Sequence, residues 1–395
     1  MIVSKSIKDS VAVIGMGCTQ FGELWDKSAT DLMIEAVQET LGVVPALELN
    51  DLDAYWLGTM GSNSGLPLAK ALKTGYKPIT RVENMCATGS EAFRASCYAV
   101  AAGACDVAMA IGVEKLKDSG TSGLVIPDPI RDGTFSGMTA PALYSMIVPA
   151  YCKKYGVTEQ EMKEVLTRIA WKNHQNGSKN PRAQFKNCPD KDMIAGSPTV
   201  AGQLGVLDCS GVADGAAAAI VVSADRASDY CEHPLYVKAL SIATGSGQGT
   251  MSPEYDFTTF PEVVESARRA YSQAGISQPG DEIDFAEVHD CFTPTELVLM
   301  EDLGFSERGS GWRDALAGRF DLDGDLPVNP DGGLKSFGHP IGASGLRMLF
   351  EVWLQLSNSA GERQISGVST ALTNNLGGQP GECVSFVGIF GSEPG

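Results

Sequence analysis

The sequence predicts an α/β protein made of two similar units, because strand-like and helix-like segments alternate and their order occurs twice along the chain. Each half reads as strand, helix, strand, glycine-containing loop, helix and strand. The length of 395 residues also exceeds what one hydrophobic core usually serves. We therefore expect two units on largely parallel sheets, with a site formed by the loops at the carboxyl ends of strands.

The first half begins with the apolar run "VAVIGMG", which is typical of a buried strand. The segment "TDLMIEAVQETLG" has apolar residues at helical spacing and ends at Gly42, a residue type that commonly closes helices. A strand and a loop then lead to Cys86, and a helix of small residues and an apolar strand follow it. The expected elements are strand 11–17, helix 30–42, strand 51–60, helix 89–103 and strand 107–116.

The second half repeats this order from "LYVKALSIATG" onward. Its second strand ends in "HDCF", and its loop ends in "SFGHPIGASG" directly before a helix. The expected elements are strand 235–245, helix 261–275, strand 283–292, helix 343–358, strand 365–375 and a final strand at 383–390.

Residues 117–199 interrupt this pattern, and we interpret them as an inserted cap over the site. They hold a loop with Pro and Gly, followed by two helical segments. The pattern resumes at "VLDCSGVADGAAAAIVVSA", whose apolar end predicts the strand that closes the first unit. The predicted domains are an N-terminal half (1–116 plus 200–233), the cap (117–199) and a C-terminal half (234–395).

The repeat predicts where reactive side chains meet. If an internal two-fold axis relates the halves, the loops that hold Cys86 and His339 are equivalent and face each other. The strand end at 58–60 is then equivalent to the one that carries His289 and Cys291. We expect Cys86, His339, His289 and Cys291 to converge on one site.

Each of these residues also has a less specific interpretation. Cys86 precedes a predicted helix, where free N–H groups and the helix dipole lower the pKa of a thiol, yet buried unreactive cysteines are common. His339 lies in a rigid loop between Gly338 and Pro340, which favours function over a merely hydrogen-bonded histidine. "HDCF" offers a histidine, a carboxylate and a thiol. A metal site is the rival interpretation, but no second His/Cys cluster supplies further ligands, so we expect no metal.

The net charge of −18 argues against nucleic acid or a membrane surface as a partner. No apolar run approaches the ~20 residues of a membrane span, and the first residues lack a secretory signal. Ten cysteines without a pairing rhythm are typical of reduced thiols, so we expect a cytoplasmic protein.

A cluster of basic residues stands out within this acidic chain. It suggests an anionic small ligand, and a solvated helix face is an equally good explanation. Its members are Lys163, Arg168, Lys172, Lys179, Arg182, Lys186 and Lys191.

Three motifs, "NMCATGSEAF", "HDCF" and "GHPIGASG", occur in this order on the duplicated pattern and resemble the thiolase superfamily. The likeness runs over nearly the whole chain and looks closest to the sterol-carrier-protein-type and archaeal thiolases. It implies a five-layered α-β-α-β-α fold with an inserted loop domain that holds coenzyme A. It also implies acyl-CoA and free coenzyme A as substrates, with no tightly bound cofactor.

The resemblance assigns roles by motif. Cys86 would be the acylated nucleophile, His339 would activate it, His289 would polarise a thioester oxygen, and Cys291 would move the α-proton. The backbone N–H groups of Cys86 and Gly377 would form a second oxyanion hole. Familiar thiolases carry a C-terminal Cys-x-Gly motif, and in this chain Asn375 stands at the position of its cysteine. Cys383 lies further along, in the expected final strand, so we expect it to be a core thiol and not part of the site.

Contacts with coenzyme A or the acyl chain are expected from Lys172, Lys179, Arg182, Met138 and Ser246. The acyl chain stays open: acetoacetyl-CoA, a longer or branched 3-ketoacyl-CoA, or an aromatic one such as benzoylsuccinyl-CoA. A homodimer is expected, and a hetero-oligomer with a small zinc-ribbon/OB-fold protein is a further possibility.

Three other functions compete with acyl transfer. A thiolase-like retro-aldolase would cleave a 3-hydroxyacyl-CoA beside such a partner protein, and Cys86 argues against it. A ketoacyl synthase shares the fold and the cysteine but usually relies on two histidines, or His and Asn, in place of "HDC". A non-catalytic acyl-CoA-binding subunit would not need Cys86, Cys291 and His339.

Overall fold

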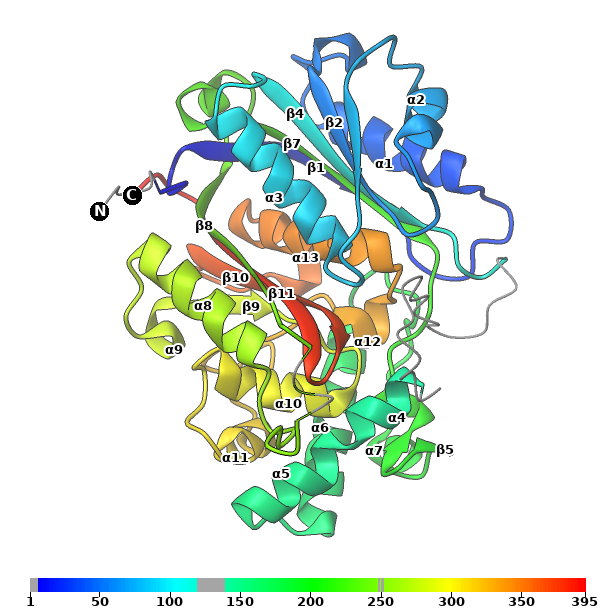
Figure 1. The fold of residues 1–395 in the computed structure, drawn as a ribbon, viewed down its shortest axis with the longest axis vertical. Helices are drawn as coiled ribbons and strands as arrows, with labels where there is room; N and C mark the ends of the chain where they lie inside the picture. Colours follow the sequence, from blue (N-terminus) through cyan, green and yellow to red (C-terminus); the bar gives the residue numbers. More distant parts are fainter. Residues whose placement is uncertain (1–5, 119–138, 248, 250–251) are drawn as a thin grey trace.

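The computed structural model describes residues 6–118, 139–247, 249 and 252–395, and its centre is a nine-stranded mixed sheet (Figure 1). The strand order is β3-β2-β4-β7-β1-β8-β11-β10-β9. In the N-terminal half the strands are β1 (Val11–Cys18), β2 (Ala54–Gly58), β3 (Ile79–Val82), β4 (Val107–Glu114) and β7 (Gly215–Ser223). In the C-terminal half they are β8 (Leu235–Thr244), β9 (Phe285–Glu287), β10 (Thr370–Gln379) and β11 (Glu382–Gly391).

The strand order confirms the duplication. From the junction outward, the first half runs β1-β7-β4-β2 and the second runs β8-β11-β10-β9, so each half places its own first and last strands side by side. The halves meet through a short pairing of Ala12 with Tyr236 and Val13 with Leu235.

The expectation of largely parallel sheets is wrong. Among the neighbouring strands of this sheet in the described residues, the parallel pairs are β2 with β3, β2 with β4, and β9 with β10, and the other pairs are antiparallel. The physical reason is the connections: β10 and β11 form a tight hairpin, which can only be antiparallel, and β7 returns from the insertion against both neighbours.

Helices complete a five-layered arrangement. α1 (Ala29–Gly42) covers one face of the N-terminal strands, and α8 (Pro261–Ala274) covers the outer face of β8 and β11 (Figure 1). α3 (Thr88–Ala101) and α13 (Ile341–Leu356) lie between the two sets of strands.

Alternation along the strands explains this layering. On β1, Ile14 packs in the cluster that contains α1, whereas Val13 packs in the cluster with α3 and α13. On β11, Phe390 belongs to the same central cluster, where its ring lies 6.0 Å from that of Phe93 on α3.

The two central helices approach closely because glycines face one another. A Cβ on Gly89 would lie 2.6 Å from the carbonyl oxygen of Gly342, and one on Gly345 would lie 2.2 Å from Ser90 Oγ. This contact brings the start of α3 and the start of α13, and therefore Cys86 and His339, to one place.

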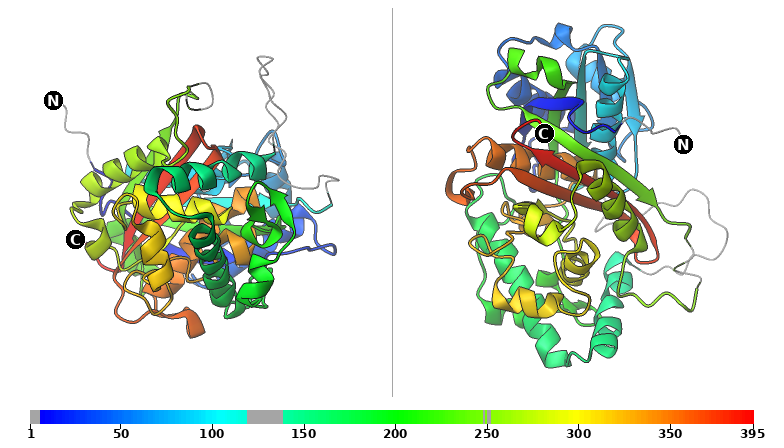
Figure 2. Two further views of the ribbon diagram at one scale, coloured as in Figure 1. Left: turned by 90° about the horizontal axis from the view of Figure 1, so that it is seen from below. Right: turned by 90° about the vertical axis from the view of Figure 1, so that its left-hand side faces the viewer.

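The insertion packs mainly on the C-terminal half, and its green helices lie at the end of the molecule opposite the blue N-terminal elements (Figure 2). Its long helix α6 contacts three helices of that half, α10, α11 and α12. Within the described ranges no helix has the length and apolar character that a bilayer crossing requires. The described part of the cap comprises α4 (Ala140–Ser145), α5 (Ile147–Tyr155), α6 (Glu159–Ser178) and α7 (Lys191–Ala195), and the short strands β5 (Thr199–Ala201) and β6 (Leu204–Gly205) follow at its end. The remaining helices are α2 (Leu66–Leu72), α9 (Pro279–Glu282), α10 (Thr293–Asp302), α11 (Gly311–Ala317) and α12 (Gly333–Phe337).

Candidate active site

Cys86, His289 and His339 form one cluster. The Cys86 sulfur and one ring nitrogen from each histidine all lie within 4.8 Å of one another. The two imidazole rings meet edge to face, with centroids 5.4 Å apart. Both histidines are about 1% exposed, and Cys86 is half-buried. The convergence of these three residues, expected from the repeat, is what the structure has.

Cys86 sits at a sharp turn immediately before α3. The turn is held by the Ala87 N–H, which donates to the Asn84 carbonyl (3.0 Å), and by the Thr88 N–H, which donates to Met85 (3.1 Å). Met85 adopts φ 50°, a left-handed conformation that is uncommon for a residue with a side chain. Such strain is a frequent feature of functional turns, because the surrounding bonds force a side chain at the turn into one orientation.

Hydrogen bonds assign the tautomer of His339. The Ser344 hydroxyl donates to the Pro340 carbonyl (3.0 Å), so its oxygen accepts from His339 Nδ1 at 2.7 Å. Because Nδ1 carries the proton, Nε2 keeps a free lone pair, and it has no hydrogen-bond partner. His339 is therefore built to accept a proton.

His289 has the opposite tautomer. Ser90 Oγ donates to Asn375 Oδ1 (3.2 Å), which orients the amide so that Asn375 Nδ2 donates to His289 Nδ1 at 3.2 Å. His289 Nε2 must then carry the hydrogen, so this ring is a donor. A donor and an acceptor imidazole beside one thiol suit oxyanion stabilisation and proton transfer, respectively.

The same tautomers bear on metal binding. Three donors of this kind match the protein ligands of a catalytic zinc site, and the described residues hold no other such group. A metal would need a lone pair on His289, yet Nδ1 already accepts from Asn375 and Nε2 is protonated. The hydrogen bonding thus favours a nucleophilic role for Cys86 over a metal site.

Burial overturns the expected low pKa of Cys86. Desolvation raises the pKa of this thiol from 9.0 to about 12, and the negative charges of Glu83 and Glu114 add to the increase. Desolvation dominates because seven of the ten residues that line the cavity beside Cys86 come from the cap and the C-terminal half. Burial likewise lowers the pKa of His339 to about 3. The resting pair is a neutral thiol and a neutral imidazole.

Cys291 lies in the same cavity and is 3% exposed. Burial raises the pKa of its thiol well above the usual value, the nearby Cys86 adds to the increase, and hydrogen bonds with Thr295 and Tyr144 oppose it. Cys97 and Cys383 are buried core thiols, as expected, and Cys383 Sγ donates to the Gln379 carbonyl.

The cavity beside Cys86 is small, with a volume of ≈ 30 Å³. Gly378 is part of its wall, and Gly377 lies one residue back, against the backbone of Asn84 and Ala87. The wall combines all three parts of the chain: Met60, Met85 and Cys86, then Ala140 and Tyr144 of the cap, then His289, Cys291, Phe292, Ile341 and Gly378.

Sequence reasoning missed the residues behind this wall. Asp290 is 1% exposed and accepts hydrogen bonds from Asn173 Nδ2 (2.7 Å) and the Leu334 N–H (2.6 Å). Asn173 also donates to Glu296 (2.7 Å), so the cap helix α6 holds the "HDCF" segment through buried polar bonds. Asp290 within "HDCF" was the sequence signal that a buried polar network could lie here, but its hydrogen-bond partners are distant in sequence.

Two of the predicted coenzyme A contacts already have protein partners in this structure. Lys172 is 4% exposed, and its ammonium pairs with Glu296 (2.8 Å) and donates to the Val328 carbonyl (2.8 Å). Arg182 pairs with Glu39 and donates to the Cys18 carbonyl, so it ties the cap to the N-terminal half. Their charges are already neutralised by buried or half-buried partners.

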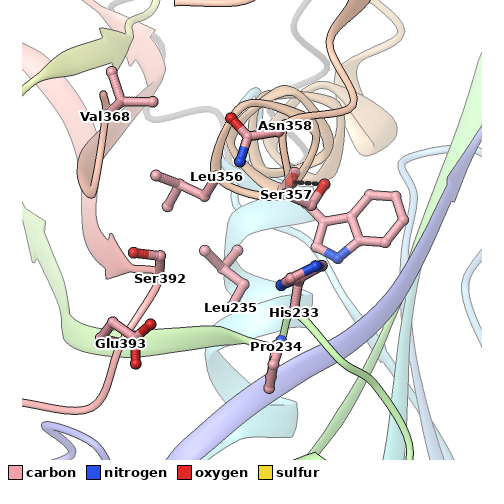
Figure 3. Close-up of a pocket in the computed structure, with 10 residues that line it drawn as sticks. His233, Pro234, Leu235, Leu356, Ser357, Asn358, Val368, Ser392 and Glu393 are labelled. Atoms are coloured by element: carbon pink, nitrogen blue, oxygen red, sulfur yellow. Dashed lines mark hydrogen bonds between the residues drawn. The ribbon is translucent and has the colours of Figure 1, made fainter. Parts of the chain in front are cut away.

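The remaining predicted contacts lie elsewhere. Lys179 is exposed at the end of α6 and stays a prediction, and Met138 lies outside the described residues. Ser246 lines a separate cavity with Tyr255 and Glu262, not the one beside Cys86. Two histidines, His174 and His233, lie outside the Cys86 cluster. His233 lines a third cavity, near the end of α13 (Figure 3).

Comparisons with known proteins match this geometry. The family model described as the N-terminal domain of thiolase matches residues 11–225, and the one described as thiolase C-terminal domain-like matches residues 243–387. An acetyl-CoA acetyltransferase from Methanothermobacter thermautotrophicus is 41% identical over 384 residues, covering 94% of this chain and 97% of that protein. Sterol carrier protein 2 from Bos taurus is 30% identical, covering 95% and 72%. A solved structure described as an Ltp2–ChsH2(DUF35) aldolase has a TM-score of 0.84 at 25% identity, covering 98% and 99%.

Proposed function

This chain belongs to the thiolase family, and from that premise we propose that it makes or cleaves a 3-ketoacyl-CoA through an acyl group carried on Cys86. It is an acyltransferase, and its substrates are coenzyme A thioesters. The observation that carries the proposal is one thiol, Cys86, between a proton-accepting His339 and a proton-donating His289.

In the first step, Cys86 Sγ attacks the thioester carbonyl while His339 Nε2 takes its proton. Because the pKa of the thiol is raised to about 12, attack and proton transfer occur together and no free thiolate accumulates. The tetrahedral oxygen accepts from the backbone N–H groups of Cys86 and Gly377. The C–S bond to coenzyme A then breaks, and the departing thiolate takes the proton from His339.

In the second step, Cys291, a neutral thiol at rest, passes its proton to the vacant His339 Nε2. The resulting thiolate removes a proton from the α-carbon of an acetyl-CoA, and His289 Nε2–H donates to the oxygen on which the enolate charge develops. The α-carbon attacks the acyl carbonyl on Cys86, the acyl–sulfur bond breaks, and His339 gives its proton to the departing Cys86 sulfur, while Cys291 keeps the proton from the α-carbon. Cleavage runs through the same steps in reverse, with coenzyme A as acceptor.

Mass spectrometry of the protein after incubation with acetyl-CoA tests these roles. We expect an acetyl adduct on Cys86 that Cys86→Ala abolishes and that the matched core variant Cys97→Ala retains. Cys291→Ala should keep the adduct but lose condensation with a second acetyl-CoA. Loss of the adduct in Cys291→Ala would refute the division of labour between the two thiols.

A second candidate is retro-aldol cleavage of a 3-hydroxyacyl-CoA. The TM-score of 0.84 to the Ltp2–ChsH2(DUF35) aldolase favours it, whereas the placement of Cys86 between two histidines favours acyl transfer. Aldol cleavage needs no covalent acyl-enzyme. Release of an aldehyde or ketone from a 3-hydroxyacyl-CoA, with no adduct from acetyl-CoA, would decide for the aldolase.

We also propose a homodimer, or a hetero-oligomer with a small zinc-ribbon/OB-fold protein, in the cytoplasm. The aldolase structure, which contains a second component, supports the hetero-oligomer. All ten cysteines are free, which supports a reducing compartment. Light scattering on the purified chain, alone and with a co-expressed partner, measures the assembly.

A further inference from the structure

A side chain of the cap, Tyr144, forms part of the wall of the cavity beside Cys86. We propose that Tyr144 limits the acyl group on Cys86 to acetyl size and is the specificity-determining residue of this enzyme. The inference rests on the acyl transfer proposed above and deepens it by naming the acyl class.

The size of the cavity sets the limit. A single water molecule needs a cavity volume of about 10–15 Å³. The ≈ 30 Å³ beside Cys86 therefore holds roughly two water-sized groups. An acetyl group places a methyl and an oxygen beyond the carbonyl carbon bonded to sulfur, which matches this space. A butyryl, branched or aromatic acyl group needs one of the wall residues to move.

Tyr144 is the wall residue that reaches in from the cap, and it is held in place on two sides. Its hydroxyl donates to the Gly378 carbonyl at 3.1 Å, across the cavity from the helix that carries it. Its ring packs on that of Phe292, with centroids 4.8 Å apart. The hydroxyl also forms a hydrogen bond with the Cys291 thiol, and the side chain is 2% exposed, so the ring cannot swing aside without breaking these contacts.

The neighbours of Tyr144 explain why it decides the length. Ala140, one turn earlier on α4, also lines the cavity and leaves space, whereas Tyr144 fills it. The position after Cys291 is Phe292, so the ring of Tyr144 also presses on the segment that carries the second thiol. Removing the Tyr144 ring would therefore lengthen the cavity toward the cap.

Charge further narrows the acyl class. The described residues of the wall include no Lys or Arg, so an acyl group that carries a carboxylate would lose its hydration without a cationic partner. This argues against a benzoylsuccinyl group, on grounds of both charge and size, and in favour of a small neutral one.

The test compares acylation of Cys86 by acetyl-CoA, butyryl-CoA, hexanoyl-CoA and benzoyl-CoA, followed by mass spectrometry at early times. In the wild type we expect acetyl to be fastest, with hexanoyl and benzoyl slower by more than about a hundredfold. Tyr144→Ala should raise the ratio of hexanoyl to acetyl rates by about tenfold or more. Tyr144→Phe keeps the ring and should keep the wild-type ratio.

Two further variants guard against a folding defect. Tyr144→Leu opens the cavity less drastically and should shift the same ratio in the same direction. Tyr151→Leu is the matched control, because Tyr151 is a buried tyrosine on α5 that bonds Glu301 and does not line the cavity. It should leave the ratio unchanged, whatever it costs in stability.

The outcomes separate the two proposals. An acetyl adduct on Cys86 together with equal rates for hexanoyl-CoA in the wild type, or an unchanged ratio in both Tyr144→Ala and Tyr144→Leu, would overturn the role of Tyr144 and leave acyl transfer standing. No adduct from any of the four thioesters would overturn acyl transfer itself. An equal shift in Tyr151→Leu would assign the effect to loosening of the cap and refute the specific role.

Discussion

The protonation state of Cys86 gives a prediction that separates the tertiary structure from the local sequence. Raising the pKa of the thiol from 9.0 to about 12 lowers the thiolate fraction about a thousandfold at any pH below 9. A helix N-terminus acting alone would lower the pKa and give a largely ionised thiol near neutral pH. Alkylation by iodoacetamide distinguishes the two, because the thiolate is the reactive form.

The assay follows alkylation of the Cys86 peptide by mass spectrometry from pH 6 to 10. We expect the rate to rise about tenfold per pH step of one throughout this range, without a plateau, because the pKa lies above it. The exposed Cys188 in the same digest reports that the reagent is active at every pH. The shape of the curve is the readout, since slow access to a half-buried thiol changes the rate but not its pH dependence.

His339→Gln sharpens the test. Because burial lowers the pKa of His339 to about 3, it is neutral across the whole range and forms no ion pair with a thiolate. We expect His339→Gln to leave the alkylation curve unchanged while it abolishes acylation by acetyl-CoA. A plateau below pH 8 that disappears in His339→Gln would refute the neutral pair and establish a thiolate–imidazolium pair.

Three further predictions concern the residues that hold the site. Ser344→Ala removes the hydroxyl oxygen that accepts from His339 Nδ1 and keeps the proton there. Single-turnover acylation should therefore slow by up to about 10²-fold with little change in KM. An unaltered acylation rate would contradict the tautomer assignment. Lys172→Met leaves the buried Glu296 without its cationic partner. Urea unfolding should then show a loss of about 3–5 kcal/mol with no change in KM for acetyl-CoA. A raised KM with unchanged stability would support Lys172 as a substrate contact. Burial and the charge of Glu296 raise the pKa of Asp290 to about 7. This carboxyl therefore stabilises the fold most below its unfolded pKa near 3.8, and that contribution is lost as the pH rises to about 7. Asp290→Asn should flatten the fall in Tm between pH 5 and 8, and identical slopes of Tm against pH in the two proteins would contradict the raised pKa.

The sequence alone predicted most elements of the repeat, because buried strands and amphipathic helices leave a local signature. The apolar run at 11–17 and the helical spacing at 30–42 both correspond to elements of the structure. Elements without such a signature were missed. All ten residues of α10 are buried, so no polar face marks it as a helix, and β3 is a short edge strand of four residues.

The motif residues of the site were also within reach of the sequence. Cys86, His289, Cys291 and His339 stand in motifs whose positions repeat in the two halves, so their convergence follows from the order of elements. The supporting residues were not within reach. Asn173 bonds Asp290 from 117 positions away, and nothing local to either residue indicates its partner.

The sequence by itself therefore determined the duplicated fold and the identity of the reactive side chains, because both depend on short-range patterns that occur twice. Only the tertiary structure decided their state. Whether a thiol ionises, whether a lysine binds a ligand or a buried Glu296, and how long an acyl group can be depend on which groups surround each atom. Those surroundings come from three distant parts of the chain, and desolvation by them is the largest cause of the raised pKa of Cys86.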